Sequence, residues 1–444
     1  MGVCDVDSAR RAWGVKVVED YYKSRPVLGV PPGACKGYAD FREVLADPGI
    51  DMVSIATPDH WHAYMVVEAF KAGKDVYCET PLAYSVEEAK LVMAAARKYG
   101  RILQTGAVQR AEFQFRIACE IVRNGGIGKV RHVDVCFGGA DPAQLLGGPS
   151  QPHRFFENPA NAVAEGAPNP DIDWNAWLGG APLTPYSDKL AVRGIPTQAP
   201  TFWRFDDYFG CGSCGEWGAH HFDIAAWALG LEESGPVKVV RSNEPHSTNP
   251  LHGGRRQTGM SFVMADGTTV EHRPASSWGC VFYGTDGVVA VNRGNFAAWT
   301  GTGVEPSAKV RAALEDGSFD GMKKRAFYTQ ERKDAATKEF GLSCLAAANK
   351  AAKAFDLRHA KTKLRVCQNV CADFAARFID RKATCAGEEI GARASILGSL
   401  CNLSYVYDTG FCWDPARNDF AQGGGDSNWL RRAVYRDGWE PKLG

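Results

Sequence analysis

A short stretch near residue 80 combines a carboxylate and a hydroxyl at the end of an apolar run. The run 76–78 (Val-Tyr-Cys) is followed by Glu79 and Thr80, and Pro81 then ends the extended segment because proline lacks a backbone N–H. If the run is a strand of a parallel sheet, both side chains lie at its carboxyl edge, where such folds bind ligands. Glu79 and Thr80 are therefore candidates for ligand and proton chemistry.

A second candidate segment follows the glycine-rich residues 210–215. A helix here would place Glu216, His220 and Asp223 on one face, at spacings of four and three. A carboxylate beside an imidazole can orient the ring and set its pKa, which suits general acid–base catalysis. The alternative is a packed histidine with a solvated carboxylate. The glycines favour a functional role, because they let a ligand approach the backbone closely.

The same segment raises the question of a metal. It contains Cys211, Cys214, His220 and His221, and thiolates and imidazoles are the usual zinc ligands. No second cysteine pair has zinc-ribbon spacing, and the 14 cysteines are scattered along the chain, which is typical of buried reduced thiols. We predict no metal site.

Other residues could contact a cofactor or a sugar. His60 and His62 begin a helix after the run 52–56, and a helix N-terminus at this position can face a dinucleotide. The alternative is a capped surface helix. Trp203 and Trp217 lie in an aromatic, glycine-rich region, and their flat rings suit either a sugar face or the core.

The first 106 residues alternate apolar runs with helical patterns. Strand-like runs occur at 2–4, 52–56, 76–78 and 102–104. We expect the run 52–56 to be buried on both faces, with helices from residue 8 (with one apolar face), at 38–45 and at 86–98. This alternation predicts an α/β fold with a parallel, doubly wound Rossmann sheet.

The glycine-rich phosphate turn of such a sheet is absent from the first hundred residues. Asp5 ends the first apolar run, as would the acidic residue that binds a ribose hydroxyl after the second strand. We therefore expect the sequence to start at the second strand. In the order 3-2-1-4-5-6 the first strand lies mid-sheet and would precede Met1. Asp5 favours NAD over NADP, because it repels a 2′-phosphate.

The pattern changes beyond residue 129. Strand-like runs separated by Asp-Gly turns predict a mostly antiparallel sheet, with helices near 365–381 and 388–406. These runs lie at 130–137, 237–241, 257–264, 268–273, 280–283 and 288–292. We predict a Rossmann domain at 1–125 and an α+β domain for substrate binding and oligomerisation at 126–444.

Composition limits the partners. Lys+Arg and Asp+Glu are both 51, so the formal charge is zero and nucleic acid is not an expected partner. No apolar run approaches the ~20 residues of a membrane span. The N-terminus has no signal-peptide pattern, so we expect a cytoplasmic protein, with export open if a leader precedes Met1.

Several motifs, in the same order along the chain, resemble those of the Gfo/Idh/MocA oxidoreductases. Residues 216–223 resemble that family's Asp-x-x-x-His helix, and 389–393 and 413–415 resemble C-terminal signatures of one of its branches. The N-terminal motifs are 57–62 (Thr-Pro-Asp-His-Trp-His), 78–82 (Cys-Glu-Thr-Pro-Leu) and 104–110.

The resemblance implies a Rossmann domain, a sheet domain that mediates homo-oligomers, and NAD(P)-linked chemistry on small carbohydrates. It implies that His220 is the general acid/base, with Glu216 as its partner and Thr80 in the seat of a catalytic lysine. Cofactor contacts are implied for Asp5, Ala56, Thr57, Pro58, His60, His62, Glu79 and Gln109. Substrate contacts are implied for Trp203, Trp217, His221 and Asp223.

Two positions depart from the family pattern. The lysine of its Glu-Lys-Pro motif is Thr80, which can donate a hydrogen bond but carries no charge, and the Asp of its helix is Glu216. Our leading hypothesis is an NAD-dependent oxidoreductase in which His220 exchanges the proton of a sugar or polyol hydroxyl. The alternatives are NAD-assisted elimination or glycoside cleavage without net redox, and a non-catalytic protein that binds a sugar or a partner.

Overall fold

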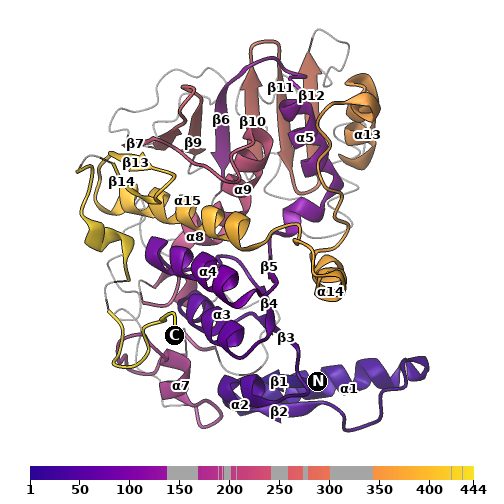
Figure 1. The fold of residues 1–444 in the computed structure, drawn as a ribbon, viewed down its shortest axis with the longest axis vertical. Coiled ribbons are helices and arrows are strands. Elements are labelled where there is room, and N and C mark those ends of the chain that lie inside the picture. The colour runs from indigo at the N-terminus through magenta and orange to yellow at the C-terminus, as the bar shows by residue number, and fades with distance from the viewer. Residues whose placement is uncertain are drawn as a thin grey trace.

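The computed structural model describes residues 1–137, 169–241 (except 189, 193, 195–201 and 207), 259–273, 279–300 and 344–444 (except 422 and 433). A small α/β region and a large sheet lie at opposite ends of the molecule, and helix α15 (Glu388–Val406) runs between them (Figure 1). The large sheet is mostly antiparallel, so the predicted fold class is confirmed. None of the described helices combines the length and the apolar character needed to cross a bilayer.

The α/β region alternates parallel strands with helices. β1 pairs with β2, and β4 pairs with both β3 and β5. The elements are β1 (Gly2–Cys4), α1 (Ser8–Lys23), η1 (Pro26–Leu28), β2 (Lys36–Tyr38), α2 (Phe41–Ala46), β3 (Met52–Ile55), η2 (Asp59–Trp61), α3 (His62–Lys71), β4 (Asp75–Cys78), α4 (Val86–Tyr99) and β5 (Leu103–Thr105). The alternation confirms the expected βα series.

These strands form two short parallel sheets. β1–β2 and β3–β4–β5 are not joined by ladder hydrogen bonds among the described residues. Figure 1 shows β2, β1, β3, β4 and β5 following one another up the molecule. The break lies between β1 and β3, where the order 3-2-1-4-5-6 has its first strand.

Side-chain caps set where the helices begin. Asp7 Oδ1 accepts hydrogen bonds from the backbone N–H groups of Ala9 and Arg10, at 2.9 and 3.0 Å. Ser85 Oγ accepts from the N–H of Glu88 at 3.3 Å, and Glu88 Oε2 accepts from the N–H of Tyr84 at 2.9 Å. This close variant of a capping box starts α4 directly behind the end of β4.

The helices expected near the N-terminus are present, with differences in detail. The segment 38–45 contains the end of β2 and a cap at Asp40 before α2 begins, so the helix starts later than expected. The helix expected from residue 8 is confirmed as α1, and its apolar face points outward: Trp13, Val17 and Tyr21 are 51%, 46% and 48% exposed. The helix instead packs through Gly14, where an added Cβ would lie 2.8 Å from a Val3 methyl.

Strand β3 is not buried on both faces. Met52 and Ser54 are exposed, while Ile55 is buried. β3 pairs with β4 alone among the described strands, so its other edge has no ladder partner to shield it. A continuous apolar run therefore marked a strand but not its degree of burial.

The second region is a nine-stranded sheet in the order β12-β11-β10-β6-β9-β8-β7-β13-β14. Its neighbours are antiparallel except for β6 and β9. The strands are β6 (Val130–Cys136), β7 (Lys238–Arg241), β8 (Met260–Val263), β9 (Thr269–Arg273), β10 (Gly279–Gly284), β11 (Gly287–Asn292), β12 (Asn295–Thr300), β13 (Phe411–Asp414) and β14 (Asp419–Phe420). The runs expected at 130–137 and from 237 to 292 correspond to strands β6 to β11, with residues 257 and 258 outside the described residues, and β12, β13 and β14 were missed.

Helices accompany this sheet and link it to the α/β region. They are η3 (Val108–Ala111), α5 (Phe113–Arg123), α7 (Trp174–Leu178), η5 (Phe202–Phe205), α8 (Gly212–Glu216), α9 (Gly218–Leu229), α13 (Cys344–Ala354), η7 (Leu357–His359), α14 (Val370–Asp380) and η8 (Ser427–Leu430). Helices α14 and α15 confirm the expectations at 365–381 and 388–406. Most of the segment 138–200 and all of residues 301–343 lie outside the described residues.

The C-terminal signatures have packing roles. An added Cβ at Gly391 would lie 2.1 Å from Thr105 Oγ1, so only glycine lets α15 approach the end of β5 this closely. Arg393 Nε donates to Glu389 Oε1 at 2.9 Å, and its Nη1 donates to the carbonyl oxygen of Pro415 at 2.8 Å. These contacts fix α15 against both regions. The boundary placed at residue 125 stays a prediction, because one core of buried residues spans both regions.

Candidate active site

The centre of the candidate site is the turn after β4. The N–H of Glu79 donates to the carbonyl oxygen of Ile55 at 2.9 Å, which extends the pairing with β3. Tyr77 Oη donates to Glu79 Oε1 at 3.1 Å. An added Cβ at Gly106 would lie 2.2 Å from Glu79 Oε2, so the glycine makes room for this carboxylate. Burial raises the pKa of Glu79.

Thr80 and His220 meet across the two regions of the molecule. Helix α8 ends at Glu216, and α9 begins at Gly218, which places His220 in the first turn of α9. His220 Nε2 lies 3.1 Å from Thr80 Oγ1. Its buried Nδ1 has no hydrogen-bond partner among the described residues. The structure thus joins the two candidate stretches through a hydroxyl–imidazole contact.

The environment keeps His220 neutral. Burial, together with the positive charge of Arg293, lowers the pKa of His220 from 6.5 to about 3. A neutral imidazole offers a lone pair to a proton at neutral pH. His220 is therefore in the protonation state that a general base requires.

Glu216 does not orient His220 as the helical spacing predicted. Its Oε2 pairs with Arg204 Nη1, and it lies close enough to Asp59 for the two carboxyl groups to interact. The break between α8 and α9 at Trp217 explains the difference, because the spacing rule assumes one continuous helix. The expected Glu216–His220 pair is replaced by a Glu216–Arg204 ion pair.

Asp59 forms a buried acidic pair with Glu216. Asp59 Oδ2 accepts a hydrogen bond from the N–H of Cys211 at 2.8 Å, which ties η2 to the start of α8. Burial and the nearby Glu216 raise the pKa of Asp59 well above its usual range. The pair therefore favours a state in which Asp59 carries a proton, while Arg204 compensates the charge of Glu216.

The ring nitrogens of His60 and His62 face backbone carbonyl groups rather than an open site. Those of His62 lie 2.6 Å from the oxygen of Pro81 and 2.8 Å from that of Thr57. Both nitrogens of His60 lie 3.3 Å from carbonyl oxygens, those of Phe209 and residue 177. Burial lowers the pKa of both rings. They hold loops together, and the cofactor contacts implied for them have no support in this geometry.

The remaining cofactor candidates lie near strand ends. Ala56 is exposed, and Thr57 and Pro58 are half-buried, directly after β3. Asp5 follows β1, and its Oδ1 accepts from the N–H of Asp7 at 2.9 Å. Positions 56–58 are therefore open to a ligand at the edge where Glu79 lies, whereas Asp5 belongs to the separate β1–β2 sheet.

The four residues implied in substrate binding separate into two groups. Trp217 lies beside His220, with ring centroids 6.2 Å apart, and Nε2 of His221 lies 3.3 Å from Arg293 Nη1. Asp223 instead accepts hydrogen bonds from Arg110 with both carboxylate oxygens, at 2.6 and 2.7 Å, and both side chains are buried. Trp203 packs against an apolar cluster of buried residues, and the guanidinium of Arg204 lies over its ring. Asp223 and Trp203 thus have structural partners.

Gln109 connects η3 to His220 and Arg293. With its amide oriented to satisfy both ends, the nitrogen donates to the carbonyl oxygen of His220 at 2.8 Å and the oxygen accepts from Arg293 Nη1 at 2.9 Å. Gln109 therefore supports the first turn of α9 and holds Arg293 near the ring of His220. This placement gives Gln109 a role in positioning His220 that the expected cofactor contact did not include.

Three residues of this site were missed from the sequence. Arg204, Arg293 and Asp59 lie outside periodic patterns and became candidates only through contacts with residues far along the chain. Asp59 lies inside the stretch 57–62 that was selected for its two histidines. Its position directly after an apolar strand was the one signal that pointed to it.

Comparison with known proteins finds relatives of the N-terminal part of the chain. Residues 8–107 match the Gfo/Idh/MocA family model, described as an oxidoreductase family with an NAD-binding Rossmann fold. An uncharacterized oxidoreductase, YrbE of Bacillus subtilis, is 41% identical over 90 residues, which are 20% of this chain and 26% of that protein. The scyllo-inositol 2-dehydrogenase (NAD(+)) of Bacillus subtilis is 30% identical over 222 residues, which are 47% of this chain and 61% of that protein.

The fold agrees with these matches. A levoglucosan dehydrogenase in complex with NADH and levoglucosan superposes with a TM-score of 0.51 at 16% identity, covering 93% of this chain and 89% of that one. The chain spans about a quarter of the length of YrbE and about three-fifths of the length of the inositol dehydrogenase. The N-terminal segment of this chain is therefore similar to the Gfo/Idh/MocA oxidoreductase family, and the fold of the chain is similar to that of the levoglucosan dehydrogenase.

Proposed function

We propose that this protein is an NAD-dependent dehydrogenase that oxidises a secondary hydroxyl of a sugar, sugar derivative or polyol to a ketone. The observation that carries the proposal is the contact between Thr80 Oγ1 and the neutral His220, 3.1 Å apart at the carboxyl edge of β4. A proton acceptor at this edge is what oxidation of a hydroxyl needs. The inositol dehydrogenase relative and the NADH-bound levoglucosan dehydrogenase support the substrate class.

The residues at the strand ends fit the nicotinamide half of the cofactor. Ala56, Thr57 and Pro58 form an accessible edge after β3, and the space at Gly106 brings Glu79 to the same edge. We assign Thr57, Pro58 and Glu79 to the nicotinamide and its ribose, and Asp5 to the adenosine ribose, which favours NAD over NADP. Bound NAD would supply the hydride acceptor.

The chain itself handles the proton. As the carbinol carbon loses a hydride, its hydroxyl loses a proton, and His220 Nε2 is the acceptor. Thr80 Oγ1 can donate to Nε2 in the resting site and to the substrate oxygen during reaction. Trp217 lies beside the ring of His220, where an apolar sugar face could stack. Burial and the positive charge of Arg293 lower the pKa of His220 and keep it neutral until it receives the proton.

The test is a panel of sugars, inositols and anhydrosugars, incubated with NAD⁺ or NADP⁺ while the appearance of reduced cofactor is followed. A ketone product with stoichiometric NADH supports the proposal. A product that forms only with NAD⁺ present, but without net NADH, selects elimination or glycoside cleavage. Sugar binding without any product, in protein that also binds NADH, selects the non-catalytic alternative.

We also propose that the protein self-associates through its nine-stranded sheet. Tyr283, Val288 and Trp299 are cross-strand neighbours on β10, β11 and β12, and all three are partly exposed. An apolar row of this kind suits an interface between copies. Light scattering of the wild type and of a Trp299→Lys variant tests it: the variant should shift toward monomer, and an unchanged mass would contradict the proposal.

A further inference from the structure

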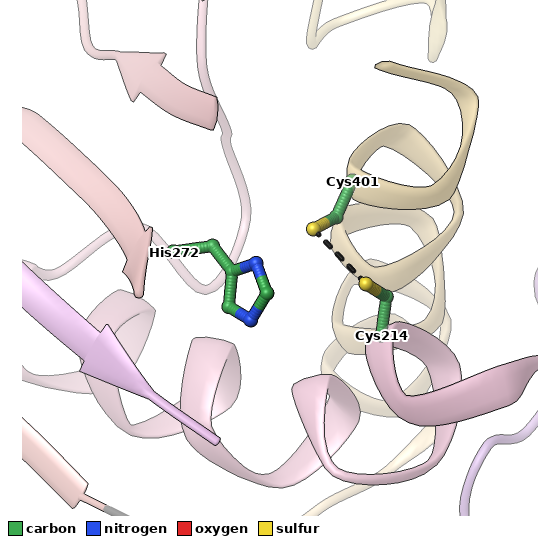
Figure 2. Close-up of side chains that lie close together, drawn as sticks. All are labelled: Cys214, His272 and Cys401. Carbon is green, nitrogen blue, oxygen red and sulfur yellow. Dashed lines mark hydrogen bonds between the residues drawn. The ribbon is translucent and has the colours of Figure 1, made fainter. Parts of the chain in front are cut away.

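Two cysteines and a histidine meet in the interior, away from the site described above. Cys214 comes from α8, His272 from β9 and Cys401 from α15, and all three side chains are buried. One potential ligand atom from each lies within 4.8 Å of the others. Figure 2 shows both sulfur atoms and the imidazole ring directed toward a common space.

The distances suit a small tetrahedral ion. The sulfur atoms of Cys214 and Cys401 are 3.3 Å apart. Zinc–sulfur bonds of ~2.3 Å at tetrahedral angles require sulfurs roughly 3.8 Å apart, so a shift of about half an ångström completes the arrangement. Two thiols and an imidazole also match the donor preference of zinc.

The imidazole is held in place as the ring of a metal ligand usually is. His272 Nδ1 lies 2.6 Å from Tyr405 Oη, and the ring stacks on Phe137 with centroids 4.1 Å apart. Partners of this kind fix the orientation of a ligating ring.

We propose that Cys214, Cys401 and His272 bind one zinc ion. Both thiols lose their protons on binding, so Zn²⁺ and two thiolates form a neutral centre that an apolar interior tolerates. A redox disulfide is the weaker alternative, because both thiols are 0% exposed and so are shielded from a redox partner. The sequence did not indicate this site, since its ligands are spread over three distant elements.

The ion would link the helix pair of the candidate active site to the rest of the fold. Cys214 lies in α8, two residues before Glu216, while Cys401 and His272 belong to α15 and to the nine-stranded sheet. The centre therefore stabilises the position of α8 and α9 without contacting substrate. The proposed zinc site does not depend on the dehydrogenase function proposed above.

The test uses the full chain, refolded or expressed with Zn²⁺ and purified under reductant, with metal content measured by mass spectrometry. We expect one zinc per chain in the wild type and none in the Cys214→Ala/Cys401→Ala double variant. Cys119→Ala is the matched control: it is equally buried, and its thiol donates to the carbonyl oxygen of Ile224. Cobalt substitution should give thiolate-to-metal absorption in the wild type and the control only.

A measurement on the wild type covers the case in which the double variant fails to fold. Chelation should lower the Tm, and Zn²⁺ should restore it; in the chelated protein Cys214 and Cys401 should become open to alkylation. Wild type that takes up no zinc overturns the proposal, as does a folded double variant that retains it. A disulfide between Cys214 and Cys401 in metal-free protein purified without reductant also overturns it, in favour of a redox pair.

Discussion

Thr80 Oγ1 and His220 Nε2 lie 3.1 Å apart, although 140 positions separate the two residues in the sequence. The contact joins the end of a parallel strand to the first turn of α9. It places a hydroxyl where the family resemblance implies a lysine, and it leaves the neutral imidazole of His220 as the proposed proton acceptor. The predictions below follow from this pair and its surroundings.

Two variants of Thr80 distinguish the effect of its hydroxyl group from the effect of its branched shape. Thr80→Val keeps the branched side chain but removes the hydroxyl, and we expect kcat to fall about tenfold, the usual cost of a lost hydrogen bond of ~1.4 kcal/mol. Thr80→Ser should keep most of the activity. Steady-state kinetics of both variants measure this, and equal rates for Val and Ser would show that the hydroxyl has no part in turnover.

Thr80→Lys should increase dehydrogenase turnover. An ammonium at this position lies between Glu79 and His220 and can stabilise the developing alkoxide, an electrostatic effect that hydrogen-bonding threonine cannot supply. The comparison is kcat on the best substrate, with NADH binding measured in parallel. Unchanged kcat with normal NADH binding would mean that the proton route does not pass through position 80.

The pH dependence should lack the usual histidine inflection. The pKa of His220 falls from 6.5 to about 3 in the folded protein, so the base is already neutral at pH 6. We expect kcat to show no step near pH 6.5. A sigmoid loss centred there, in protein that stays folded, would contradict the neutral buried imidazole.

The lowered pKa of His220 also makes the free energy of unfolding depend on pH. The unfolded chain binds a proton at this histidine below pH 6.5, whereas the folded chain does so only near pH 3. The contribution of His220 to the free energy of unfolding is therefore full above pH 6.5 and is lost as the pH falls from there toward 3. In urea unfolding, His220→Gln should lack this part of the acid dependence.

Asp59→Asn should stabilise the protein at alkaline pH. Burial and Glu216 raise the pKa of Asp59, so its ionised form destabilises the fold as the pH rises through that pKa. The amide keeps an acceptor for the N–H of Cys211 and removes the charge. We expect about 1 kcal/mol more stability at pH 8. The exposed Asp51→Asn is the control, and a loss of stability in Asp59→Asn would show that the carboxylate is required.

Asp223→Asn should destabilise the fold rather than weaken substrate binding. It leaves Arg110, which is 3% exposed, without its bidentate partner, a change that costs about 3–5 kcal/mol in buried pairs. Asp380→Asn removes a surface pair with Arg377 and should cost less than about 1 kcal/mol. A higher KM with unchanged unfolding would instead support the substrate contact that the family resemblance implied.

The parts of the molecule that local sequence determines were predictable. An apolar run followed by Pro81 defined the end of β4, and the spacing of Ser85 and Glu88 marked the start of α4. Turn pairs in the second half indicated the strands from β7 to β11. These features depend on neighbours within a few residues, which a single sequence displays.

The parts that depend on tertiary contacts were not predictable. Glu216 turned to Arg204 because the helix breaks at Trp217, and nothing in the residue types shows that break. Asp223 was selected by helical spacing, but the face it occupies is set by Arg110 on a distant element. Spacing rules identify which residues share a face, and only the fold determines what that face meets.

The most direct test of the central claim compares the wild type with His220→Gln on the substrate that the panel identifies. The amide oxygen of glutamine retains an acceptor for the Thr80 hydroxyl but cannot act as a base, and His359→Gln, on the surface, serves as the matched control. We expect NADH formation in the wild type and the control, and a loss of about 10²–10⁴-fold in His220→Gln with NADH binding preserved. Equal rates in wild type and His220→Gln would contradict the account, as would a well-folded wild type that binds NADH but oxidises no sugar or polyol.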